Sequence, residues 1–270
     1  MSTPTLSNAY PFARAVQDWV KALRMWRLWT ALGLEDLSDR YRRTLLGISW
    51  VVASFGIFVF VKILVFGQMT AVSTSEFALF VTLGFGLWSF ISTVVLDSCV
   101  AYTACGNWLL GTAVPYPVFF LQSIFRNWLI FALTLIVMAA VVVWQKHTWS
   151  PIMLSALAGL LVYVVTPAWL AAILAPLCAR YRDMWHAMQT VMRLLFFVTP
   201  IIWMPSQSTQ LAAIAKYNVI THFIEIVRQP LIYDTIPYTS WIVVLAVNVV
   251  GILAGFVTYA LTRNRIAFWL

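Results

Sequence analysis

Residues 118–144 read VFFLQSIFRNWLIFALTLIVMAAVVVW and hold a single charged side chain, Arg126. A helix needs about 20 consecutive, predominantly apolar residues to cross the hydrocarbon core of a bilayer. Further segments of this kind recur along the chain, at 45–66, 77–100, 152–178, 185–203 and 241–261. The sequence therefore predicts an all-α integral membrane protein with six transmembrane helices.

The composition supports this fold class. Of the 270 residues 62% are hydrophobic and 10% are charged, whereas soluble domains contain about 25% charged residues. The net charge is +8, but the basic residues gather in a few short segments, which indicates membrane topology rather than nucleic-acid binding. Cys99, Cys105 and Cys178 lack the spacing of a metal site, and we expect no metal.

The distribution of basic residues predicts the orientation. They are concentrated before the first apolar segment, between the fourth and fifth segments, and after the last one. Cytoplasmic loops carry such an excess, so both termini are expected in the cytoplasm. The expected organisation is a cytoplasmic arm at 1–44 without a cleavable signal peptide, a membrane domain at 45–262 and a cytoplasmic tail at 263–270.

Two regions outside the apolar segments have helical patterns. Residues 17–34 form a basic amphipathic pattern, which predicts a helix lying in the membrane interface or packed on a cytoplasmic partner. Residues 205–240 repeat apolar positions at helical spacing and place Glu225 and Arg228 together on another side. We expect one or two short helices there that gate the outer mouth of a pathway.

Motifs for catalysis are missing from the sequence. It contains no G-x-x-x-x-G-K-[ST] phosphate loop, no H-E-x-x-H zinc motif and no G-x-S-x-G nucleophile motif. The chain is therefore expected to have no catalytic residues and to bind no cofactor itself. A transport role does not require such a catalytic motif.

Ionisable residues inside apolar segments are candidates for function. Arg126 and Arg193 each lie about eight residues, or about 12 Å, from the cytoplasmic start of their segments. Together they could bind an anionic head group, or Asp97 could neutralise one of them structurally. Lys62 is expected to reach the outer interface through its long side chain.

Aromatic residues away from the segment ends could line a pathway for sugar rings, and these are Phe85, Trp88, Phe90 and Trp128. The alternative is ordinary packing or contact with lipid. Gly251 and Gly255 form a G-x-x-x-G motif, which predicts close packing of the last helix.

Three motifs, in order along residues 35–270, resemble those of a known family. Residues 39–50 read DRYRRTLLGISW, residues 180–183 read RYRD with TPIIW at 199–203, and residues 217–225 read YNVITHFIE. They resemble motifs of ABC-2 type permeases, the membrane subunits of exporters of O-antigen, capsule and teichoic acid. The sequence departs from the family pattern at Val219, where the family has proline.

The resemblance implies a homodimer with two copies of a separate ATPase that binds ATP and Mg, and a lipid-linked polysaccharide as substrate in a bacterial inner membrane. It places the ATPase-coupling residues in two loops, at Asn107, Trp108, Leu109, Leu110, Arg180, Arg182 and Asp183. The gate would comprise Asn218, His222, Phe223, Glu225 and Arg228.

Other functions remain open at this stage. An ABC-2 exporter of a small lipophile or drug would tolerate loss of the aromatic lining. A membrane enzyme acting on lipid-linked sugars would work without an ATPase and would carry acidic residues at the membrane surface. A non-catalytic assembly factor is a further alternative.

Overall fold

The structure is a computed structural model that describes residues 11–67, 72–105, 111, 113–145, 150–205 and 208–270. The regular elements in these ranges are all helices. Five of them are long and apolar enough to cross a membrane: α3 (Ser49–Phe66), α4 (Thr74–Val100), α6 (Pro117–Gln145), α7 (Leu154–Arg180) with the preceding turn η1 (Pro151–Met153), and α11 (Tyr238–Thr262). The chain is therefore a multi-pass membrane protein.

The expected fifth segment, 185–203, is helical only in part. Helix α8 (Asp183–Val198) has 16 residues and is about 24 Å long, which is short for a span. It ends because Thr199, whose backbone is extended, precedes Pro200, and proline disfavours the helical conformation in the residue before it. The structure thus shows five helices of spanning length, and the crossing expected at 185–203 stays a prediction.

The first spanning helix begins later than residue 45. Arg43 and Gly47 both have left-handed backbones, with φ of 65° and 53°, which a right-handed helix does not accommodate. Helix α3 therefore starts at Ser49.

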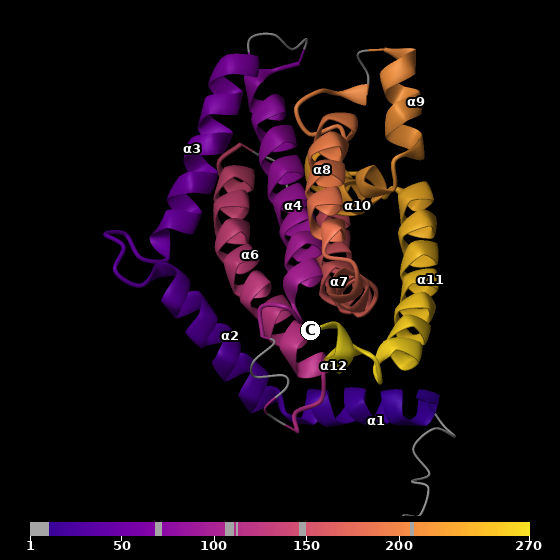
Figure 1. Ribbon diagram of the computed structural model, residues 1–270. Coiled ribbons are helices and arrows are strands. Elements are labelled where there is room, and N and C mark those ends of the chain that lie inside the picture. Colours follow the sequence, from indigo (N-terminus) through magenta and orange to yellow (C-terminus); the bar gives the residue numbers. More distant parts are fainter. Residues whose placement is uncertain (1–10, 68–71, 106–110, 112, 146–149, 206–207) are drawn as a thin grey trace, which may run out of the picture.

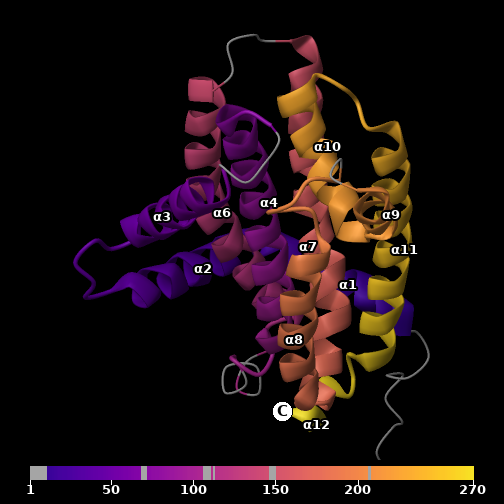
Figure 2. The ribbon, with the colours of Figure 1, turned by 90° about the horizontal axis from the view of Figure 1, so that it is seen from above.

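Figures 1 and 2 both place α3 at one edge of the bundle and α11 at the opposite edge. Helix α4 runs through the interior: 67% of its spanning window is buried, against 17% for α3. It contacts α6, α7, α8 and α10 (Val219–Tyr233), and its apolar side chains contribute most to the main hydrophobic core.

Helix α1 (Pro11–Arg24) and the C-terminal α12 (Ile266–Trp269) lie at the same end of the bundle (Figure 1). The expected continuous helix over 17–34 is wrong, because the chain turns at Met25 and continues as α2 (Trp26–Tyr41). The Trp29 indole spans this turn and donates to the Ala22 carbonyl at 3.2 Å. The arm therefore comprises two helices, of which α1 contacts α6 and α11 while α2 follows α6.

Helix α1 is amphipathic in its contacts. Its inner side packs the Trp19 ring 5.2 Å from the ring of Phe120, and Asp18 accepts hydrogen bonds from Tyr259 Oη at 2.9 Å and Arg263 Nε at 2.8 Å. Its other side exposes an apolar stripe of Phe12, Val16, Val20 and Leu23.

The G-x-x-x-G motif of α11 lies against α7. A Cβ atom added at Gly251 would lie 2.5 Å from the Trp169 ring, and one at Gly255 would lie 3.0 Å from the Trp169 carbonyl oxygen. The Trp169 indole and the Thr166 hydroxyl donate to Asn248 Oδ1 at 2.9 and 3.0 Å. Glycine thus lets the large indole approach the α11 backbone closely.

Candidate functional site

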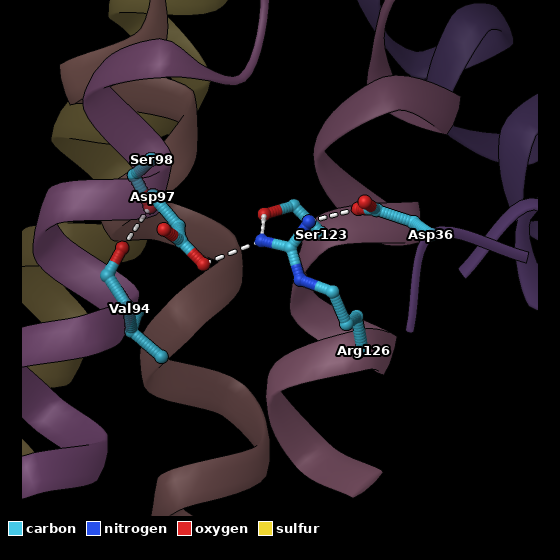
Figure 3. A network of polar contacts seen from close by, with 6 residues as sticks. All are labelled: Asp36, Val94, Asp97, Ser98, Ser123 and Arg126. Atoms are coloured by element: carbon cyan, nitrogen blue, oxygen red, sulfur yellow. Dashed lines mark hydrogen bonds and ion pairs between the residues drawn. The ribbon is translucent and has the colours of Figure 1, made fainter. Parts of the chain in front are cut away.

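Arg126 is the centre of an ion-pair network that joins three helices (Figure 3). Its Nη2 lies 2.5 Å from Asp97 Oδ2 of α4, and its Nη1 pairs with Asp36 of α2. Ser123, one turn earlier on α6, accepts a further hydrogen bond at 3.2 Å. The structure therefore contains the Asp97 pairing that the sequence left open, together with a partner, Asp36, that the sequence did not suggest.

A polar cavity of about 520 Å³ lies beside this network. Its charged lining consists of four carboxylates, from Glu35, Asp36, Asp39 and Asp97, against the guanidinium groups of Arg40 and Arg126. The excess of negative charge disfavours an anion there. Binding of an anionic head group by Arg126 stays a prediction, and its carboxylate partners would compete with such a ligand.

Cys105 lines the same cavity. Burial raises the pKa of its thiol above the usual value, and the negative charge of Asp36 raises the pKa further, while Arg126 partly offsets both effects. The pKa of the Cys105 thiol therefore depends on how closely Asp36 of α2 approaches the segment that follows α4.

Arg193 lies in a different place. It is exposed on α8 and lines a cavity of about 650 Å³ between α4 and α8, together with Trp88 and Phe196. The Arg193 Nε donates to the Gln189 carbonyl at 3.3 Å, within its own helix. Within one chain Arg126 and Arg193 thus belong to separate cavities.

The four predicted aromatic residues also divide into two groups. Trp88 lines the α4–α8 cavity, whereas Phe85 packs behind Phe196, and the rings of Phe85 and Trp88 lie 6.4 and 5.8 Å from the ring of Phe196. Phe90 and Trp128 lie in the interior, 5.5 Å from each other. Of these four residues, Trp88 is the one that lines the α4–α8 cavity and is placed to contact a molecule there.

Lys62 is buried, and the expectation that it reaches the outer interface is wrong. The residue is 7% exposed, and its ammonium group is packed inside the bundle. Its Nζ lies 4.2, 4.1 and 4.6 Å from the ring centroids of Phe58, Phe85 and Phe196. Phe58 precedes Lys62 by one helical turn, so the contact between these two residues could have been predicted from their spacing. The other two rings come from α4 and α8, and their contacts could not.

Arg228, one of the predicted gate residues, is fully buried in α10. It pairs with Glu225, and its Nη1 donates to the Pro200 carbonyl at 2.7 Å. Its guanidinium carbon lies 3.8 Å from the centroid of the Phe80 ring. Arg228 therefore connects α10 to α4 and to the turn after α8.

The other predicted gate residues make specific contacts around the same helix. Asn218 caps the start of α10 through Ile220 N and donates to Thr199 Oγ1 at 2.9 Å. The two ring nitrogens of His222 lie 2.9 Å from Ser240 Oγ and from the Lys216 carbonyl oxygen. The carbonyl of Phe223 accepts from Tyr163 Oη at 2.9 Å. Thus the region expected to form short helices consists of α9 (Thr209–Tyr217) and the tightly bonded α10.

The predicted coupling residues lie partly outside the described residues, since these exclude Asn107, Trp108, Leu109 and Leu110. Arg180, Arg182 and Asp183 are exposed where α7 ends and α8 begins. The Arg180 guanidinium lies 5.7 Å from the ring of Trp269 in α12, so this turn is at the α1 end of the bundle.

A second cavity of about 520 Å³ lies at this end, between α1 and residues 113–116. Lys21, Arg24 and Arg263 contribute positive charge to its lining, and Asp18 contributes negative charge. Burial raises the pKa of Tyr116, which also lines this cavity. Among the residues with described positions, no group of His, Cys, Asp and Glu side chains could hold a metal ion.

Comparison with known proteins gives one relative at low identity. No protein-family model matches the chain. The chain is 25% identical over 187 residues to the O-antigen export system permease protein RfbA of Myxococcus xanthus, an alignment that covers 68% of this chain and 71% of the relative. The resemblance to ABC-2 polysaccharide-export permeases is therefore confirmed at the level of distant homology, and this multi-pass membrane protein is a distant relative of an O-antigen export permease.

Proposed function

We propose that the chain is the permease subunit of an ABC exporter that moves lipid-linked cell-surface polysaccharide, O-antigen or capsule, across a bacterial inner membrane. The observation that carries the proposal is the distant homology to an O-antigen export permease in a chain with five apolar, membrane-length helices. In this proposal the active unit is a homodimer with two copies of a separate ATPase, which binds ATP and Mg.

The proposed topology has six crossings and two cytoplasmic termini. The common location of α1 and α12 at one end of the bundle supports it, because an even number of crossings returns the chain to its starting side. The crossing that is additional to the five long helices is assigned to α8 together with the turn that follows it, and it would be the fifth in chain order. In this topology the exposed stripe of α1 lies in the inner membrane interface, where apolar side chains meet lipid.

The proposed substrate pathway runs along the α4–α8 cavity. An arginine side chain beside Trp88 and Phe196 suits a lipid-linked glycan, because a guanidinium group pairs with phosphate and aromatic rings stack on sugars. In a homodimer this cavity would face the second copy across the axis. The gate would be α10, which Arg228 links through Pro200 to the end of α8, so that motion of α8 would move α10.

Coupling to the ATPase is assigned to the α1 end. The exposed Arg180, Arg182 and Asp183 are accessible to a partner there. The coupling role of residues 107–110 is proposed from their position in the sequence.

The test is genetic and biochemical. The chain would be co-purified with the ATPase encoded beside it, and export would be measured as surface polysaccharide in a deletion strain carrying the wild-type gene. We expect an equimolar complex, and loss of surface polysaccharide when the ATPase carries a substitution of its phosphate-loop lysine. Full surface polysaccharide in the deletion strain without the complementing gene would contradict the proposal. Altered drug resistance of that strain with unchanged glycans would indicate export of a small lipophile.

One observation favours a second candidate function, an enzyme acting on lipid-linked sugars. Four carboxylates line one polar cavity beside Arg126, and paired carboxylates are common in glycosyl transfer and hydrolysis. Such an enzyme would release or transfer sugar from a lipid-linked substrate in detergent without any ATPase. Product formation by the chain alone, abolished by Asp97→Asn, would favour it.

A further inference from the structure

Lys62 is held in a box of three aromatic rings at a seam between α3, α4 and α8. Phe58, Phe85 and Phe196 each lie less than 5 Å from its Nζ. Within the described part of the chain, Nζ has no hydrogen-bond partner. An ammonium group carries three donors, so the box stabilises its charge but leaves all three donors unused.

Stability alone gives little reason for a lysine at this position. Removing a charge from water is unfavourable, and even a buried ion pair can often be replaced by apolar residues of similar volume without loss of stability. The position is surrounded by rings, which methionine would contact equally well. The unused donors therefore indicate a partner that is absent from the resting arrangement.

The surroundings identify the class of partner. The Phe196 ring contacts Lys62 and also lines the α4–α8 cavity, which contains Arg193. Phe196 follows Arg193 by three residues, about 4.5 Å along the axis of α8. Arg193 thus lines the cavity itself, Lys62 lies behind the Phe196 ring of its wall, and the flexible lysine stem allows Nζ to leave the box around Phe196.

We propose that Lys62 is a binding residue for the phosphate group of the lipid-linked substrate and receives it from Arg193 as the substrate passes along α8. This inference rests on the proposed function and adds a second cation to the pathway. In the resting state the aromatic box holds Lys62, and an entering phosphate draws its ammonium group into the cavity.

The test compares Lys62→Met, Lys62→Arg and the matched control Lys216→Met, whose lysine is exposed at the end of α9. Each variant is measured for surface polysaccharide, for the amount of assembled complex and for the midpoint temperature of unfolding in detergent. We expect Lys62→Met to reduce export at least tenfold with an unchanged or higher midpoint, Lys62→Arg to retain part of the export, and Lys216→Met to behave as wild type.

Binding is measured separately with defined probes. Geranylgeranyl pyrophosphate should raise the midpoint temperature of the wild-type complex and raise that of Lys62→Met less, whereas geranylgeraniol should not distinguish the two proteins. Inorganic pyrophosphate separates recognition of the phosphate alone from recognition of a phosphate attached to a lipid. If the phosphate alone is recognised, inorganic pyrophosphate will also raise the midpoint temperature in a Lys62-dependent way. If the lipid is required, it will not.

The outcomes separate this inference from the proposed function. Normal export by Lys62→Met, or a lower midpoint temperature with export falling only in proportion to assembled complex, would overturn the role of Lys62 and leave the permease function intact. Absence of export by the wild-type complex would instead overturn the permease function.

Discussion

Arg126 of α6 and Asp97 of α4 form an ion pair in the bundle, with Nη2 2.5 Å from Oδ2, and Asp36 of α2 pairs with the same guanidinium group. The arginine is 9% exposed and cannot lose its proton, so the two carboxylates neutralise a charge that would otherwise be buried unpaired. The network also connects the arm helix α2 to two spanning helices. Arg126 therefore has a structural role irrespective of any substrate.

Replacing Arg126 by methionine should destabilise the protein by about 3–5 kcal/mol, because Asp97 then stays partly buried without its partner. The measurement is the midpoint of unfolding in detergent. The double variant Arg126→Met/Asp97→Asn should recover part of the loss, since it removes both charges.

Arg193→Met is the matched control, because Arg193 has a similar depth in the sequence but is exposed and has no ion pair among the described residues. It should leave the midpoint within error of wild type and reduce export. A midpoint for Arg126→Met equal to that of the control would show that the network contributes little.

The spanning helices could be predicted because long apolar runs define them, and the bounds of α4, α6 and α11 lie within a few residues of the expected ones. The proximity of Glu225 and Arg228 also follows from helical spacing. By contrast, the Asp36–Arg126 pair joins residues 90 positions apart, and the aromatic box of Lys62 is assembled from three helices. Such contacts depend on tertiary packing, which cannot be predicted from the helical spacing of residues in the sequence.

The docking of α2 can be measured through Cys105. Because the negative charge of Asp36 raises the pKa of the thiol, Asp36→Asn should lower that pKa and increase the thiolate fraction at any pH below it. We expect N-ethylmaleimide to modify Cys105 several-fold faster in this variant at pH 8, as measured by peptide mass spectrometry across pH 7–9. Asp39→Asn is the control, because Asp39 lines the same cavity but is exposed and pairs with Arg42. Equal rates in all three proteins would mean that Asp36 does not influence this thiol.

Arg228 should not tolerate replacement by lysine. Its guanidinium group serves Glu225, the Pro200 carbonyl and the Phe80 ring at once, whereas an ammonium group cannot match this planar geometry. We expect Arg228→Lys to lower the midpoint of unfolding and to expose the turn at residues 199–204 to protease. Glu225→Gln should have a smaller effect, because its amide oxygen can still accept a hydrogen bond. A protease-resistant Arg228→Lys protein with an unchanged midpoint would refute the link between α10 and the end of α8.

The contact between α7 and α11 gives a prediction with an internal comparison. A methyl group at Gly251 would lie 2.5 Å from the Trp169 ring, so Gly251→Ala must displace the indole and disturb its hydrogen bond to Asn248. Overpacking of this kind costs about 1–3 kcal/mol, so the midpoint of unfolding should fall.

Gly56 is the control, because a Cβ atom there meets nothing within 4 Å, and alanine is favoured over glycine inside a helix by about 0.5–1 kcal/mol. Gly56→Ala should therefore match or exceed wild type. If Gly251→Ala instead unfolds at the wild-type temperature, α7 and α11 are not as closely packed as described.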